Sequence, residues 1–99
     1  MAFKLIWSPS ARLDIKDIAT YIAEDKPSAA KQFVKSLFQA VERLGEFPES
    51  GRVVPEFGDQ SIREVIRRPC RIIYRIDQAK LTLEIVRVWH AARGMPDIY

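Results

Sequence analysis

The sequence predicts an α+β domain: an N-terminal strand, an antiparallel helical hairpin, and then a three-stranded antiparallel sheet packed against the helices. Two patterns support this order. Between residues 11 and 44, apolar residues recur at the three- and four-residue spacing of amphipathic helices. Between residues 71 and 90, β-branched residues are frequent and apolar residues alternate with polar ones, as in half-buried strands. A chain of 99 residues can bury one core but not two, so residues 1–99 are expected to form one domain.

The first strand is expected from Phe3 to Trp7, a short apolar run that is closed by Ser8 and Pro9. Serine is a favoured helix N-cap and proline suits the first helical turn, so a helix should follow at once. The helix is expected to end near Asp25 and to carry an apolar stripe on one face. The stripe consists of Ala11, Ile15, Ile18, Ala19 and Ile22.

A second helix is expected to begin at Pro27 and to end at Gly45, a typical C-cap residue. Because the two helices are joined so tightly, they should form an antiparallel hairpin. The second helix has a longer apolar stripe than the first, which consists of Ala30, Phe33, Val34, Leu37, Phe38, Val41 and Leu44. Residues 47–60 contain two prolines and two glycines, which predicts a loop.

Three strands complete the predicted fold: Ile62 to Ile66, Arg71 to Asp77 and Lys80 to His90. If Gln78 and Ala79 form a two-residue turn, a purely apolar face packs under the helices. Its cross-strand pairs would be Ile76 with Leu81, Tyr74 with Leu83, and Ile72 with Ile85. Arg87 and Trp89 share the parity of this face, where Arg87 could either extend its charged end to solvent at the sheet edge or pair with an acid from the helices. The opposite face would carry Arg71, Ile73, Arg75, Thr82, Glu84, Val86, Val88 and His90.

Several classes of protein are excluded by composition. The single cysteine, Cys70, cannot form an internal disulfide, and with one histidine it cannot supply the ligands of a structural zinc site. The apolar start of the chain is too short for a signal peptide or a membrane span. We therefore expect a cytoplasmic protein with no bound metal or cofactor and no membrane association.

Positive charge is concentrated in the second part of the chain. Residues 62–99 hold eight Lys or Arg against four Asp or Glu, whereas residues 1–61 hold eight against nine. A cationic sheet beside a nearly neutral helical hairpin suggests a surface for an anionic partner, either nucleic acid or an acidic protein segment.

Four segments form a wider pattern that spans most of the chain. They are Trp7 to Ala11 leading into Asp14 and Ile15, Phe47 to Arg52, Arg71 to Ile76, and Val88 to Arg93. In this order they resemble the RelE/ParE toxin superfamily of bacterial type II toxin-antitoxin systems, and within it the ParE branch. The resemblance implies the same order of strand, helical hairpin and sheet, and a cognate antitoxin that covers and neutralises the toxin.

The resemblance also implies an activity, which differs between the branches. ParE-like members poison DNA gyrase by protein contact, whereas RelE-like members are ribosome-dependent endonucleases that cut mRNA. The ending His90-Ala91-Ala92-Arg93 is similar to the His-Gly-Ala-Arg ending frequent in ParE-like sequences. This favours a gyrase inhibitor that is not an enzyme over two alternatives: an mRNA endonuclease acting at the ribosome, and an inactive module that only binds antitoxin.

Four residues are candidates for binding the target or the antitoxin: Arg71, Arg75, His90 and Arg93. Arg71 and Arg75 fall on one strand face, where they could contact phosphates or acidic side chains, although Glu84 could neutralise one of them. In the nuclease alternative the three arginines would stabilise phosphate charge and His90 would move a proton. A lone histidine at a strand end is more often a hydrogen-bonding surface residue, so no catalytic residue is assigned under the gyrase reading.

Overall fold

The computed structural model describes residues 2–98 and contains two helices, five strands and a short 3-10 helix. The helices are α1 (Pro9–Asp25) and α2 (Pro27–Glu46). The strands are β1 (Lys4–Trp7), β2 (Arg52–Val53), β3 (Ile62–Arg67), β4 (Cys70–Asp77) and β5 (Thr82–His90), followed by the 3-10 turn η1 (Ala91–Arg93). The predicted helical hairpin and the three predicted strands are confirmed. In the described part of the chain, neither helix is both long and apolar enough to cross a membrane.

The five strands form one mixed sheet in the order β1-β5-β4-β3-β2. The three central strands are antiparallel as predicted, but the sheet is larger than predicted at both edges. The N-terminal strand β1 pairs in parallel with β5, and β2 adds two residues beside β3. Residues 47–60, expected to be a loop throughout, therefore contain a short strand.

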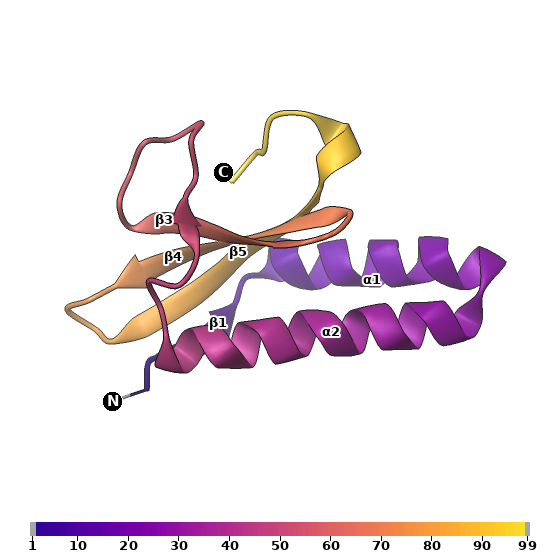
Figure 1. The fold of residues 1–99 in the computed structure, drawn as a ribbon, viewed down its shortest axis with the longest axis horizontal. Coiled ribbons are helices and arrows are strands. Elements are labelled where there is room, and N and C mark those ends of the chain that lie inside the picture. Colours follow the sequence, from indigo (N-terminus) through magenta and orange to yellow (C-terminus); the bar gives the residue numbers. More distant parts are fainter. Residues whose placement is uncertain (1, 99) are drawn as a thin grey trace.

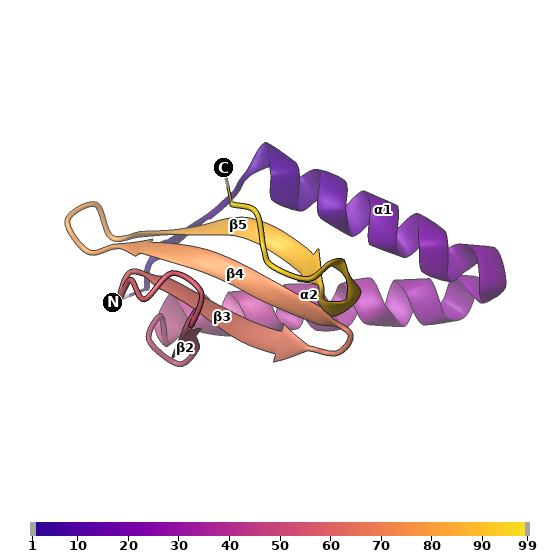
Figure 2. The ribbon, with the colours of Figure 1, turned by 90° about the horizontal axis from the view of Figure 1, so that it is seen from above.

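The sheet separates two layers of unequal size (Figure 1). The helical hairpin lies against one face, which we call the helix face. Above the opposite face, which we call the outer face, lie the segment that joins β2 to β3 and the C-terminal tail, residues 91–98 (Figures 1 and 2). The predicted open face is therefore partly covered.

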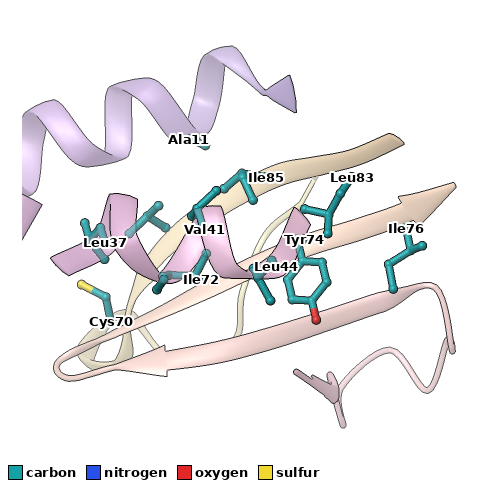
Figure 3. Close-up of a cluster of buried hydrophobic side chains, with 12 residues drawn as sticks. Ala11, Leu37, Val41, Leu44, Cys70, Ile72, Tyr74, Ile76, Leu83 and Ile85 are labelled. Atoms are coloured by element: carbon teal, nitrogen blue, oxygen red, sulfur yellow. The ribbon is translucent and has the colours of Figure 1, made fainter. Parts of the chain in front are cut away.

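The main core lies between the sheet and the helices, where Leu37, Val41 and Leu44 of α2 meet apolar residues of β4 and β5 (Figure 3). Tyr74 is fully buried in this core. Its hydroxyl donates to the Pro48 carbonyl at 2.7 Å and accepts from the Gly51 N–H at 3.0 Å, so a core residue also orders the loop after α2.

A second, smaller core lies on the outer face. Val54, Ile62, Ile73 and Trp89 are buried there, with Phe57 and Ile98 packed against them. Trp89 was predicted to lie on the helix face, and this prediction is wrong. The C-terminal tail contributes Ile98 to this cluster, which explains why the tail lies over the sheet.

The predicted turn between β4 and β5 is also wrong. The strands end at Asp77 and resume at Thr82, so four residues rather than two form the connection, and Leu81 has a φ of 53°. The observed pairs are Ile76 with Leu83 and Tyr74 with Ile85, two residues further along β5 than predicted. A shift of two keeps each side chain on its predicted face, because side chains alternate with period two.

A β-bulge then changes the faces of the last residues of β5. Ile73 pairs with Arg87 and Tyr74 with Ile85, so Val86 is the extra residue. Ser8 donates from its hydroxyl to the Val86 carbonyl at 2.7 Å and also caps α1 by accepting from the Ala11 N–H at 3.0 Å. Beyond the bulge, each residue lies on the face opposite to the predicted one. The predicted faces were therefore wrong for four residues: Arg87, Val88, Trp89 and His90.

Candidate interaction surface

Arg71 lies on the outer face, as predicted, and is held by two carboxylates. Its Nε donates to Glu64, and its two terminal nitrogens donate to the two oxygens of Glu56 at 2.8 and 2.9 Å. Glu64 is fully buried and also accepts from the Nε of Arg52 at 2.6 Å. The side chain of Arg71 is only 13% exposed, so its charge is satisfied within the chain.

This network changes the acid–base behaviour of its members. The hydrogen bonds from Arg71 lower the pKa of Glu56 from 4.5 to about 2. The hydrogen bonds that Arg71 donates to Glu56 and Glu64 raise the pKa of Arg71. Glu56 and Arg71 are therefore charged at neutral pH, and their ion pair fixes the β2–β3 connection to β4.

Arg75, the second predicted binding residue, is not part of the ion-pair network around Arg71. Its Nη1 is 3.5 Å from a carboxylate oxygen of Glu84, as the sequence had suggested for one of the two arginines. The two side chains are 41% and 39% exposed, so the pair is loose and solvated, and Arg75 is available to a partner.

His90 is half-buried and pairs across the sheet with Cys70, whose side chain belongs to the main core. It therefore lies on the helix face and not, as predicted, beside the arginines. Its Nδ1 accepts from the Ala92 N–H at 3.1 Å and caps η1. In the neutral imidazole the proton then resides on Nε2.

Arg93 lies in η1, where its guanidinium carbon is 4.1 Å from the centre of the Trp89 ring. The Arg87 guanidinium carbon is 4.9 Å from the same ring centre. The indole Nε1 of Trp89 donates to the Gly94 carbonyl at 3.1 Å. Trp89 therefore orders the tail and holds Arg93 by a cation–π contact.

Arg87 connects the tail to the helical hairpin. It donates to both carboxylate oxygens of Asp14 in α1 at 2.8 Å, and to the Asp97 carbonyl at 2.9 Å. Asp14 also accepts from the Val88 N–H at 2.9 Å and is buried. The sequence-based suggestion that Arg87 pairs with an acid of the helices is thus confirmed, although Arg87 lies on the other face.

Two hollows flank the end of the sheet that carries these residues. The first, which we call the α1 hollow, has a volume of about 430 Å³ and contains both His90 and Arg93. Its other walls are Asp14, Asp17, Ile18, Tyr21, Ile22, Pro69 and Val88. The second, the β3 hollow, has a volume of about 750 Å³ and contains Arg71. Its other walls are Arg52, Pro55, Glu56, Ile66, Arg68, Pro69, Cys70 and Ala91.

The four predicted site residues are therefore brought together only in part. His90 and Arg93 share the α1 hollow, Arg71 is in the β3 hollow, and Arg75 lines neither. Burial raises the pKa of the Cys70 thiol to about 11, so this cysteine is protonated at neutral pH and is a poor nucleophile. Residues 2–98 contain no group of three or more His, Cys, Asp or Glu placed to hold a metal ion.

Sequence reasoning missed the acidic partners Asp14, Glu56 and Glu64. Asp14 is 73 residues from Arg87 in the chain, and Glu56 is 15 residues from Arg71. One signal was present for Glu64, which shares a face with Ile62 and Ile66 in a short predicted strand. A charged residue at that position of a strand needs a partner, and the strand opposite carries arginines.

The fold, a helical hairpin on a mixed sheet, is shared with chains of solved toxin-antitoxin structures. The chain superposes on a chain of the chromosomal ParDE system of P. aeruginosa with a TM-score of 0.72, at 22% identity, covering 90% of this chain and 96% of that one. It superposes on a chain of the RelBE2 toxin-antitoxin complex of Mycobacterium tuberculosis with a TM-score of 0.63, at 19% identity, covering 91% and 99%.

Sequence comparison identifies the family. The model of the ParE toxin of type II toxin-antitoxin systems matches residues 5–95. Toxin RelE2 of Caulobacter vibrioides is 33% identical over 90 residues, which are 91% of this chain and 97% of that protein. The chain belongs to the ParE toxin family, within the RelE/ParE superfamily of type II toxin-antitoxin systems.

Proposed function

We propose that this chain is a ParE-like toxin that inhibits DNA gyrase by protein–protein contact in the cytoplasm and is neutralised by a cognate antitoxin. The match of the ParE family model to residues 5–95 supports the branch. The positive charge of the sheet and tail supports a contact surface for an acidic partner.

One observation carries the choice of a binding role over nuclease chemistry: Arg71 and His90 lie on opposite faces of the sheet. Arg71 pairs with Trp89 in the ladder and shares the outer face with it, whereas His90 pairs with Cys70 on the helix face. A proton-transfer group and a phosphate-stabilising group must reach the same reacting atoms. Two groups separated by the sheet cannot do so without rearrangement.

The charge balance points the same way. Arg71, which would stabilise phosphate charge, is already paired with Glu56 and Glu64. These carboxylates would repel an RNA backbone at the position where the nuclease needs positive charge. Binding of a protein partner requires no such free arginine.

The proposed contact residues are Arg93, Arg75 and His90, of which Arg75 lies on the outer face and His90 on the helix face, and that role remains a prediction for each. Arg93 is exposed in η1 and is oriented by Trp89, and Arg75 has only a solvated pair. The contact role first assigned to Arg71 also remains a prediction, but it requires that a partner replace or join the carboxylates that hold this guanidinium.

The test compares the two targets directly. Purified chain is added to gyrase with relaxed plasmid DNA and, separately, to a cell-free translation reaction in which the mRNA ends are mapped. The proposal expects loss of supercoiling or accumulation of gyrase-dependent DNA breaks, with intact mRNA. Cleavage of ribosome-bound mRNA with unaffected gyrase would instead establish the nuclease alternative. That alternative is supported by the 33% identity to a protein named RelE2. If folded chain affected neither target, the chain would be an inactive module.

A further inference from the structure

The α1 hollow carries two opposite charges that are not neutralised within the described part of the chain. Asp17 of α1 and Arg93 of η1 both line it, and both residues are exposed. Neither side chain forms an ion pair, with the other or with any further residue from 2 to 98. The cation–π contact with Trp89 orients the Arg93 guanidinium but leaves its charge available to an anion.

Two further polar side chains of the hollow, Asp14 and His90, differ in what they can still bind. Asp14 is saturated by Arg87, whose guanidinium donates to both of its carboxylate oxygens. In His90, Nδ1 already accepts from a backbone N–H, so Nε2 is the ring nitrogen that is left to donate. Asp17 therefore remains as an acceptor, and Arg93 and His90 remain as donors.

The interior of the hollow is apolar. Its walls include Ile18 and Ile22, which are half-buried, and Val88, which is fully buried. Because Asp17 and Arg93 are exposed, they lie at the mouth of the hollow. The volume of about 430 Å³ falls in the range of roughly 300–1,000 Å³ that is typical of small-molecule sites. The hollow can therefore hold a molecule with an aromatic ring inside and charged groups at the mouth.

We propose that the α1 hollow binds a free aromatic amino acid in its zwitterionic form. The carboxylate accepts from Arg93 and His90, and the ammonium donates to Asp17. The ring packs against the apolar walls. This inference goes beyond the proposed function, because it requires neither gyrase nor an antitoxin.

The charges at the mouth favour a zwitterion over the other small molecules that an apolar hollow could accept. A carboxylate without an amine would be attracted by Arg93 but repelled by Asp17, and an amine without a carboxylate would meet the reverse. An uncharged aromatic molecule would use neither group. A peptide segment fits less well, because the residues within it carry no free ammonium or carboxylate on the main chain.

The experiment is a nuclear magnetic resonance titration of the full, isotope-labelled chain with three probes that share one ring. They are L-phenylalanine, 3-phenylpropionate, which lacks the amine, and 2-phenylethylamine, which lacks the carboxylate. Phenylalanine should bind saturably at concentrations up to about 10 mM, a range that covers weak small-molecule binding. It should bind at least threefold more tightly than either analogue, a modest factor because contacts at an exposed mouth are screened by solvent. The largest amide shifts should occur at Ile18, Ile22 and Val88.

Two variants separate the two charges. Arg93→Gln should weaken phenylalanine and 3-phenylpropionate at least threefold, and should leave 2-phenylethylamine unchanged or bound more tightly. Asp17→Asn should weaken phenylalanine and 2-phenylethylamine, and should leave 3-phenylpropionate unchanged or bound more tightly. The probe that each variant still binds shows that the hollow has kept its shape. The matched controls Arg12→Gln and Glu24→Gln remove the same charges from exposed positions of α1 outside the hollow and should change binding less than twofold.

Four results would each overturn the inference. They are no saturable binding of phenylalanine, equal affinity for the three probes, equal losses of every probe in both variants, and amide shifts confined to residues outside the hollow. None of these measurements involves gyrase, so failure of the gyrase assay and failure here can be told apart.

Discussion

Asp14 and Arg87, on α1 and β5, form a two-pronged ion pair in which both carboxylate oxygens accept from the guanidinium at 2.8 Å. The Val88 N–H donates to the same carboxylate, so this one acid joins the helix to the exposed edge of β5 beyond the reach of β1. Because Arg87 also holds the Asp97 carbonyl, the pair links the helical hairpin to the tail.

The first prediction follows from this pair. Asp14→Asn removes the charge but keeps the size, leaving the Arg87 guanidinium without its carboxylate. Because both side chains are at most 14% exposed, we expect the free energy of unfolding to fall by about 2–4 kcal/mol in urea denaturation. The control Asp17→Asn, exposed on the same helix, should change it by less than about 0.5 kcal/mol. Equal effects would show that the loss arises from helix charge and not from the pair.

The second prediction concerns Glu56 and pH. Its pKa in the folded chain, about 2, lies below the ordinary 4.5, so its contribution to stability is present above about pH 4.5 and is lost as the pH falls toward 2. Glu56→Gln should lower the free energy of unfolding at neutral pH by only about 1 kcal/mol, because this residue is exposed to solvent. The difference from wild type should disappear by about pH 2. Glu24→Gln, on the exposed side of α1, is the charge-matched control, and a difference that persists at the acid end would contradict the assignment.

The third prediction concerns the close approach of the loop after α2 to the sheet. A Cβ at Gly51 would lie 2.5 Å from both the Glu64 carbonyl oxygen and the Tyr74 hydroxyl. Gly51→Ala must displace the loop, and we expect a loss of about 1–3 kcal/mol in thermal or urea unfolding. Tyr74→Phe, which leaves the Gly51 N–H and the Pro48 carbonyl without their partner, should cost about 1–2 kcal/mol. Ser50→Ala is the neutral control, and a Gly51→Ala chain as stable as that control would refute the predicted clash.

The fourth prediction separates the two functions at the end of the chain. If the chain inhibits gyrase by contact, Arg93→Ala should weaken inhibition, while His90→Gln should be tolerated, because glutamine keeps the polarity and similar size of the histidine side chain. If the chain is a nuclease that uses the imidazole, His90→Gln should lower the cleavage rate by roughly 100-fold while ribosome binding persists. Dose–response curves of supercoiling inhibition for the two variants decide the matter, with Arg12→Ala as an arginine control on α1. Cleavage of mRNA that is lost in His90→Gln would overturn the gyrase proposal.

The elements that could be predicted from the sequence are those specified locally. Both helices begin with a proline and carry apolar stripes, and α1 is also capped by Ser8 as predicted, whereas Gly45, the predicted C-cap of the second helix, lies inside α2, whose C-cap is Phe47. Ile72, Tyr74 and Ile76 recur at alternate positions of β4, so Tyr74 was placed correctly in the main core. The parallel pairing of β1 with β5 joins residues that are 78 apart, such as Lys4 with Thr82, and no local pattern encodes it. The two residues of β2 are too few to produce a pattern.

The candidate site was predicted less well, for two physical reasons. An assignment of side chains to faces that is correct before Val86 cannot be continued past it, and the run Ile85-Val86 contains no glycine to indicate a bulge. The partners of Arg71 and Arg87 come from other elements, so the free or paired state of these arginines depends on tertiary structure.

The extra residue in β5 affects every position of the strand that follows it. Before and after Val86 the side chains of the strand alternate between the faces in opposite phase. Ser8 stabilises the junction through two hydrogen bonds, from its hydroxyl to the Val86 carbonyl and from its N–H to the Ile85 carbonyl. Deletion of one residue there would return Trp89 to the helical side and turn His90 outward beside the arginines, without altering any letter of the ending itself. The side chains that this strand presents are therefore set by the one extra residue as much as by the identity of the residues in its ending.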